Sequence, residues 1–239
     1  MLRAGLRAFG LLLVLPAPTW AGDWQPPVSL PRPEWSSGGT AHAVAADSSG
    51  NAVAMVRQAR ISGTGGAYPL SAATWAVGQP PESPFVLGGF GTDGNVAIDA
   101  DGNAVAVWIE RADGLGVQAA FKPAGGSWQP KQTLSSVPDG LDLPNFGHAR
   151  LAMSADGHAV ATWVLYTSGG DLNGASRVVI QAAVKPAGAA TFGPAVDVSP
   201  TGPYSEPDVA VAANGDAVVV WDRGVGGAVE AALALRQNN

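Results

Sequence analysis

The chain has 239 residues, of which 46% are hydrophobic and 13% charged, with a formal net charge of −6 and no cysteine. The lack of cysteine excludes disulfides, thiol nucleophiles and thiolate metal sites. The excess of acidic residues disfavours nucleic acid and anionic membrane surfaces as partners. The length is sufficient for one domain with a hydrophobic core.

The first 21 residues have the pattern of a secretory signal. Arg3 and Arg7 precede a short apolar run, and Thr19-Trp20-Ala21 offers a small-residue cleavage site. Pro16 and Pro18 interrupt the apolar run before it reaches the ~20 residues that a membrane-spanning helix needs. We therefore expect an exported protein, periplasmic or extracellular, whose residues 22–239 form a single domain that is not inserted in a membrane.

A repeated hairpin motif organises the rest of the chain. Residues 99–108 read Asp-Ala-Asp-Gly-Asn-Ala-Val-Ala-Val-Trp, and closely similar segments occupy 154–163 and 212–221. A more divergent copy at 47–56 ends in Val56 where the others end in tryptophan. Asp-Gly or Asn-Gly between two alternating runs is typical of a tight β-hairpin, since both turn residues tolerate a positive φ.

Each repeat is predicted to contain four strands, because the hairpin is followed by a third and a fourth apolar run. The predicted repeats span about 40–88, 94–135, 149–199 and 207–236. The last repeat lacks a fourth strand. Residues 24–30 resemble 128–134, which form the fourth strand of the second repeat, and they are expected to supply the missing one.

Four such repeats of about 55 residues predict an all-β, four-bladed β-propeller, closed by the N-terminal strand. Closure would protect the two sheet edges that a linear stack leaves open. A sandwich and a larger oligomeric ring are the alternatives. Trp108, Trp163 and Trp221 are expected to fill the space between blades, although an aromatic platform for a sugar is the other use of such residues.

These units resemble those of bacterial secreted β-propeller repeat proteins. Their pattern is Val-Ala-x-Asp-x-x-Gly-Asn-Ala-x-Ala-x-Trp followed by a Trp-x-x-Pro-x-x-Leu-Ser strand, and the resemblance covers residues 24–235. Ser154-Ala155-Asp156-Gly157 departs in spacing from the Asp-box of sialidases. The resemblance implies a propeller and leaves the function open, because propellers host many unrelated activities.

Metal and cofactor motifs are weak in this chain. Asp99, Asp101, Asn103 and Glu110 have the spacing of calcium ligands in an EF-hand loop, but the glycine stands at position 4 rather than 6. The three histidines lack the spacing of a zinc site. We therefore expect no metal and no cofactor.

The longest predicted connections join the second strand to the third and the fourth strand to the next repeat, and in a propeller they share one face. Elaborated loops on a rigid scaffold commonly carry function. The ligand-binding candidates on this face are Glu34, Trp35, Glu110, Arg111, Tyr166, Asp171, Tyr204, Glu206, Asp222 and Arg223.

The predicted function is non-catalytic binding of a protein or glycan by a monomer through this long-loop face. One alternative is a small glycoside hydrolase or lyase that uses carboxylates of Glu34, Glu110, Glu206 or Asp222. These four carboxylates occupy no shared repeat position. A structural protein of the cell envelope is the other alternative, and no catalytic residue is assigned.

Overall fold

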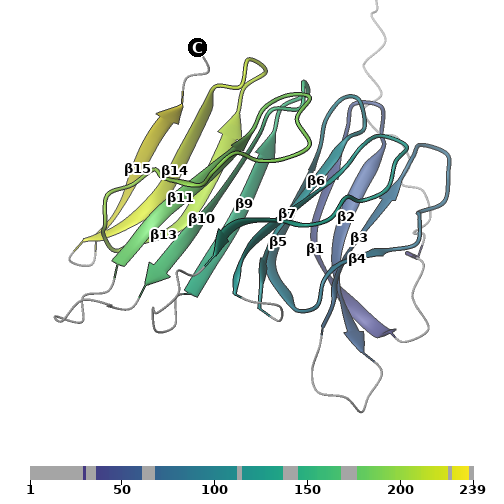
Figure 1. The fold of residues 1–239 in the computed structure, drawn as a ribbon, viewed down its shortest axis with the longest axis horizontal. Coiled ribbons are helices and arrows are strands. Elements are labelled where there is room, and N and C mark those ends of the chain that lie inside the picture. The colour runs from purple at the N-terminus through teal and green to yellow at the C-terminus, as the bar shows by residue number, and fades with distance from the viewer. Residues whose placement is uncertain are drawn as a thin grey trace, which may run out of the picture.

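The computed structural model describes residues 29–30, 36–60, 68–111, 115–136, 145–167, 177–225 and 228–236. These residues form fifteen strands and no helix, which confirms the all-β prediction (Figure 1). Within them, no helix long and apolar enough to cross a membrane occurs. The predicted signal, residues 1–21, lies outside the described part of the chain.

The strands form four antiparallel sheets, and within each sheet the strand order follows the chain. The first sheet contains β1 (Ser36–Ala46), β2 (Ala52–Arg60), β3 (Leu70–Trp75) and β4 (Phe85–Gly88). The second contains β5 (Gly91–Ile98), β6 (Ala104–Glu110), β7 (Gly116–Lys122) and β8 (Gln132–Ser136). The third contains β9 (Asn145–Met153), β10 (Ala159–Thr167), β11 (Arg177–Lys185) and β12 (Val196–Asp197). The fourth contains β13 (Tyr204–Val211), β14 (Ala217–Val225) and β15 (Ala228–Arg236).

The repeated Asp-x-x-Gly-Asn motif builds the turn between the first two strands of a sheet. Gly102 adopts φ +86°, which a side chain would disfavour. The Asp99 carboxylate accepts hydrogen bonds from the Asn103 amide (2.8 Å) and the Asp101 amide (3.1 Å). Asn103 Oδ1 accepts from Ala124 N at 3.0 Å and so ties this hairpin to the turn between β7 and β8. The motif therefore has a structural role in the turn.

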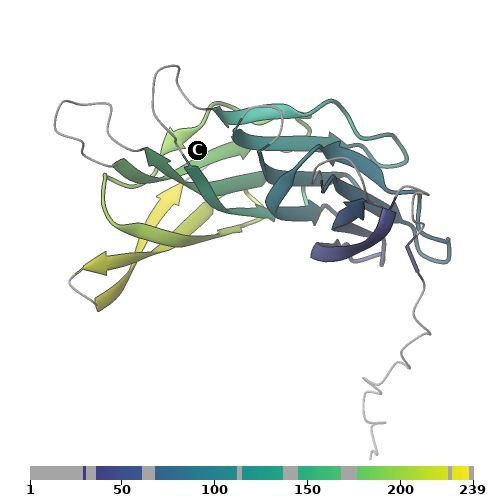
Figure 2. The same cartoon turned by 90° about the horizontal axis from the view of Figure 1, so that it is seen from below.

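The four sheets lie side by side in a curved row, with the first strands in contact: β1 with β5, β5 with β9, and β9 with β13. Figures 1 and 2 show the first and fourth sheets at opposite ends of an open arc. The closed ring that the repeat spacing predicts is therefore not formed by the described residues. Repeat spacing sets the number of sheets, whereas the turn from one sheet to the next depends on the side chains packed between them.

The fourth sheet contains three described strands, in the order β13-β14-β15. The predicted closing strand at residues 24–30 falls largely outside the described residues. Of that segment only Ser29 and Leu30 are described, and they lie in no strand.

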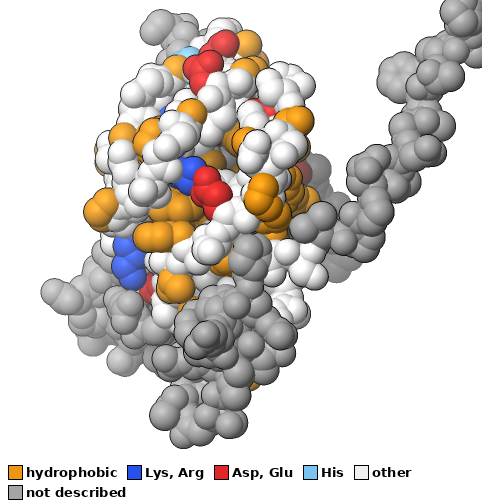
Figure 3. Space-filling view, turned by 90° about the vertical axis from the view of Figure 1, so that its right-hand side faces the viewer, with side chains coloured by type: hydrophobic (Ala, Val, Ile, Leu, Met, Phe, Trp, Pro, Cys, Tyr) orange, Lys and Arg blue, Asp and Glu red, His pale blue; other side chains and the backbone are white. Residues whose placement is uncertain are grey.

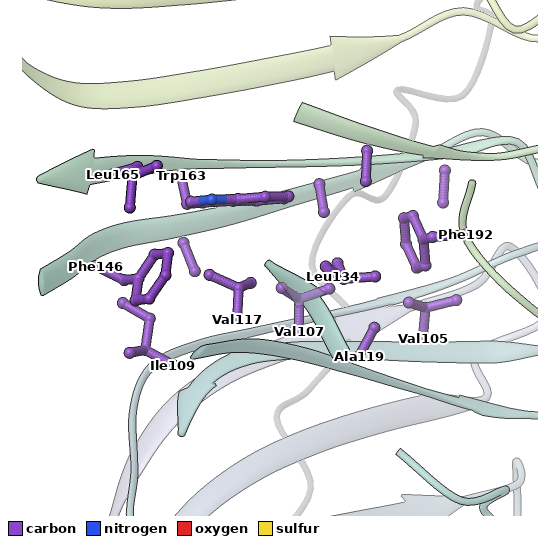
Figure 4. Close-up of a cluster of buried hydrophobic side chains, with 14 of the residues drawn as sticks. Val105, Val107, Ile109, Val117, Ala119, Leu134, Phe146, Trp163, Leu165 and Phe192 are labelled. Carbon is purple, nitrogen blue, oxygen red and sulfur yellow. The ribbon is translucent and has the colours of Figure 1, made fainter. Parts of the chain in front are cut away.

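The core consists of side chains packed between neighbouring sheets. Val105 and Val107 of β6 belong to the same buried cluster as Ala159, Ala161 and Trp163 of β10 (Figure 4). Small alanines let the two sheets approach closely, and the indole fills the space that remains. The same arrangement joins the first sheet to the second, where Trp108 packs in a cluster with residues of β2 and β3.

All three repeated tryptophans are buried, as the sequence predicts, but their indole N–H groups differ. Trp163 Nε1 donates to Gln181 Oε1 at 3.0 Å, and Trp108 Nε1 approaches Glu110 Oε2 at 3.5 Å. Trp221 Nε1 is buried without a partner among the described residues. Ala232 pairs with Trp221 where Gln181 pairs with Trp163, so the fourth sheet lacks that acceptor.

The outward faces at the two ends of the row carry exposed apolar side chains. Val44 and Val86 of the first sheet are exposed, and Figure 3, which faces this end, shows hydrophobic side chains mixed with single charged ones. At the other end, Val220 of β14 is 40% exposed, whereas Val107, at the equivalent position of β6, is fully buried. The exposure of Val220 is the direct consequence of the open arc.

This difference predicts unequal costs for one substitution in two repeats. Val107→Ala is expected to lower the free energy of unfolding by about 2 kcal/mol, since it removes buried methyl groups and leaves a cavity. Val220→Ala is expected to change it by less than about 0.5 kcal/mol, as at other exposed sites. Chemical denaturation of the two variants measures both. Equal losses would indicate that another sheet covers β14.

Candidate functional site

The first strand of each sheet contains a bulge opposite the second strand. In β5 the register passes from Thr92↔Ile109 to Asn95↔Val107, so two residues, Asp93 and Gly94, stand opposite Trp108. The same two-to-one arrangement recurs in the third and fourth sheets. The bulged residues there are 148–149 opposite Trp163 and 206–207 opposite Trp221. In β1 the register passes from Ala41↔Val56 to Ala43↔Met55, so residues 41–42 stand opposite Val56 and His42 is the second residue of this bulge.

The first residue of each bulge opposite a tryptophan has a left-handed backbone. The φ angles are +47° at Asp93, +55° at His148 and +47° at Glu206. Such a conformation costs roughly 1–3 kcal/mol for a non-glycine residue and persists only where the surrounding structure imposes it. Bulges re-aim a side chain out of the regular alternation of a strand. Three consecutive sheets thus present a polar side chain from the same strained position.

We call His42, Asp93, His148 and Glu206 the bulge cluster, because each sheet contributes one of them from its first strand. His42 and Asp93 are exposed, and the side chains of His148 and Glu206 are 34% and 53% exposed. Since consecutive first strands are neighbours, the cluster forms a line of imidazoles and carboxylates across the arc.

Ionic contacts connect the third and fourth sheets within this line. His148 Nδ1 lies 3.2 Å from Glu206 Oε1, and Arg150 lies 3.7 Å from Glu206 Oε2. Tyr166 of β10 lies beside them: burial raises the pKa of its phenol, and the negative charges of Glu206 and Asp93 raise this pKa further. The pKa of Tyr166 is therefore raised by carboxylates from the sheets on both sides of its own.

The first and second sheets are coupled in a similar way. Burial by the surrounding protein lowers the pKa of the His42 imidazole, and the Arg57 guanidinium lowers it further, whereas the Asp93 carboxylate opposes both effects. Arg57 also lies 5.4 Å from the centre of the Tyr68 ring. Tyr68 is 42% exposed, and its ring centroid is 6.3 Å from that of Phe90. An aromatic surface therefore adjoins the cluster through Arg57.

The structure places two of the predicted ligand-binding residues in the interior. Glu110 is fully buried, where one oxygen accepts from the Phe90 and Arg111 amides, both at 3.1 Å. Tyr204 is 6% exposed and packs edge-on against Trp221, with ring centroids 6.0 Å apart. Both side chains support the packing between sheets and are not presented to a ligand.

The remaining predicted residues divide into three groups. Glu206 and Tyr166 meet at the bulge cluster. The second group lies at or near the end of a second strand. Arg111 follows β6, is exposed, and donates from Nε to Thr92 Oγ1 at 3.3 Å. In the last part of β14, Asp222 is half-buried and Arg223 is exposed. Glu34, Trp35 and Asp171 lie outside the described residues.

Sequence reasoning missed His42, Asp93, His148 and Arg150 as a group. A signal was present, because Asp93, His148 and Glu206 each stand six residues before the residue that opens the hairpin. Glu206 therefore does share a repeat position with other polar residues. The alternating pattern of a strand does not reveal a bulge, so the sequence does not predict that these side chains lie on one surface.

No family model and no curated protein matches this chain. Among solved structures, it is similar to the Hadza microbial sialidase Hz136 (TM-score 0.53, 14% identity), covering 84% of this chain and 45% of that one. It is also similar to a PL25 ulvan lyase (TM-score 0.51, 11% identity), covering 87% of this chain and 58% of that one. The chain thus spans about half the length of these two proteins. At these identities the similarity shows a β-propeller-like fold alone.

The electrostatic links across the cluster predict how His42 titrates. Its pKa should lie below the usual value of a histidine, because burial and Arg57 both disfavour the protonated form. Asp93→Asn should lower it further by removing the nearby negative charge, and Arg57→Gln should raise it by removing a positive one. NMR titration of the imidazole Cε1 proton measures this pKa, and the chain has only three histidines to assign. An unchanged His42 titration in both variants would contradict the proximity of the first two bulges.

Proposed function

We propose that this protein binds a glycan across the bulge cluster. The observation that carries the proposal is the repeated, strained bulge, which presents a polar side chain from the same position in the second, third and fourth sheets, with His42 beside the corresponding bulge of the first. Strain that recurs at one position in successive sheets is typical of sites where backbone stability is exchanged for function.

The chemistry of the surface suits a carbohydrate. Carboxylates of Asp93 and Glu206 accept hydrogen bonds from sugar hydroxyls, while the guanidinium of Arg150 and the imidazoles of the cluster donate to sugar oxygens. The exposed ring of Tyr68 offers a flat apolar face next to these polar groups. The sialidase and the ulvan lyase, whose names imply carbohydrate substrates, support the same ligand class.

Glycoside hydrolysis is the second candidate, and a specific observation favours it. Asp93 and Glu206 are carboxylates from equivalent strained positions, and both act on the phenol of Tyr166, which lies between their sheets. Glycosidases use two carboxyl groups, about 5–9.5 Å apart, that flank the scissile bond. Of the four carboxylates considered from sequence, Glu110 is buried, whereas Glu206 belongs to this pair.

A glycan array probed with the full chain tests binding. We expect retention of at least one glycan, and a loss of about tenfold in affinity in Tyr68→Ala and in Glu206→Gln, which corresponds to one lost stacking or charged contact. Val196→Ala is the matched control, because Val196 is exposed on the short strand β12. Failure to bind any glycan, or unchanged affinity in both variants, would refute the proposal.

Hydrolysis is tested on the glycans that the array identifies. If the protein is a hydrolase, new reducing ends should accumulate with the wild-type chain, and Asp93→Asn and Glu206→Gln should each lower the rate by a factor of at least about 100. Tyr68→Ala should weaken binding with a smaller effect on the rate at saturating glycan. Binding without any product would leave the non-catalytic function as the correct one.

A further inference from the structure

A second concave site lies between the first two sheets, at the hairpin ends of the strands. It is a pocket of about 230 Å³ lined by residues that include Asn51, Thr74, Glu82, Ile98, Asp101 and Lys122. Asn51 and Asp101 belong to the hairpin turns, whereas the bulge cluster lies toward the opposite ends of the same strands. The pocket is therefore separate from the surface proposed above.

The equivalent place between the second and third sheets is filled. Lys185 ends β11 opposite Ala159, just as Lys122 ends β7 opposite Ala104. The Lys185 ammonium is buried, donates to the Gly157 carbonyl at 2.9 Å and lies 5.2 Å from the centre of the Phe121 ring. This lysine is thus satisfied by its own sheet and packed against an aromatic ring of the preceding one.

Between the first two sheets, no phenyl ring stands at the position of Phe121, although Trp75 lines the pocket nearby. Thr74 of β3 pairs with Val53 just as Phe121 of β7 pairs with Val105, so the threonine occupies the position of the phenylalanine. A hydroxyl cannot fill the volume of a phenyl ring. The difference between these two side chains accounts for the open space beside Lys122.

The ammonium of Lys122 is incompletely satisfied. Lys122 is 7% exposed, and its charged partner among the described residues is Glu82, whose Oε2 lies 3.7 Å from Nζ, beyond hydrogen-bond distance. Thr74 Oγ1 donates to the same Glu82 oxygen at 2.6 Å. A nearly buried ammonium with this single distant partner has donors left for a ligand, since a buried charge requires hydrogen bonds.

The charges of the lining indicate the kind of ligand. One ammonium and the two carboxylates of Glu82 and Asp101 leave the pocket with an excess of negative charge, which disfavours an anion. A neutral molecule with adjacent hydroxyl groups can accept from Lys122 and donate to the carboxylates. The volume of the pocket is below the roughly 300–1,000 Å³ of pockets that bind drug-sized ligands, so the pocket suits a smaller molecule. We propose that this pocket binds a single neutral sugar ring.

NMR titration of the ¹⁵N-labelled full chain tests this site directly. The probes are methyl β-D-glucoside, methyl β-D-galactoside, methyl α-D-mannoside and, as an anionic comparison, D-glucuronate. At least one neutral glycoside should shift the amides of Ala76, Gly102 and Gly125 in a saturable manner at millimolar concentration. D-glucuronate should bind about tenfold more weakly, because its carboxylate meets Glu82 and Asp101.

Two substitutions distinguish binding in the pocket from nonspecific contact of the sugar with the protein surface. Thr74→Phe restores the residue type found between the next two sheets and should fill the pocket, and Lys122→Met removes the ammonium while keeping an unbranched side chain. Both should abolish the saturable shifts, whereas Val196→Ala should leave them unchanged. Absence of saturable shifts in the wild-type chain, or wild-type binding in Thr74→Phe, would overturn the proposal.

The same variants keep the two proposals distinguishable. Thr74→Phe should retain glycan binding on the array, because the bulge cluster contains no residue of the pocket. Loss of array binding together with loss of the amide shifts would mean that the pocket is the sole glycan site. In that case the proposed role of the bulge cluster would fail and the pocket would stand.

Discussion

The structure depends on one contact, made three times: the alanine and tryptophan face of one sheet packs against the valine-rich face of the sheet before it. Alanine keeps the backbones close, and tryptophan fills the remaining space. Trp163 shows both consequences, since its ring is fully buried and its indole N–H is satisfied by Gln181. Three copies of this contact join the four sheets in a row, and the last face, with Val220, is exposed.

The same tryptophans are linked to the candidate site. Each stands opposite the two residues of a bulge, and the first of these residues adopts a left-handed backbone. Where Val56 replaces tryptophan, the bulge comprises residues 41–42, and neither of them adopts a positive φ. The packing of the core therefore stabilises a strained strand whose side chains are released to the surface.

Sequence differences between the repeats account for the pocket, for the unusual indole of Trp221 and for the buried carboxylate of Glu110. Thr74 in place of Phe121 opens a pocket beside Lys122, and Ala232 stands in place of Gln181 opposite Trp221, whose indole has no acceptor among the described residues. Glu110 occupies the repeat position of Leu165, and its buried carboxylate is used to hold the Phe90 and Arg111 amides. A shared scaffold thus tolerates single polar or small residues because the neighbouring sheet supplies most of the packing.

The sequence by itself determined the strands, the hairpin turns and the burial of the repeated tryptophans, because Asp-Gly turns and two-residue alternation are local signals. The tertiary structure alone decided three other features. The arc is open because its curvature is the sum of three packing angles that no local pattern encodes. Glu110 and Tyr204 lie inside because the neighbouring strands cover them. Asp93, His148 and Glu206 take equivalent places, with His42 one position further along its own strand, because bulges shift the register and adjacent first strands bring together residues more than fifty positions apart.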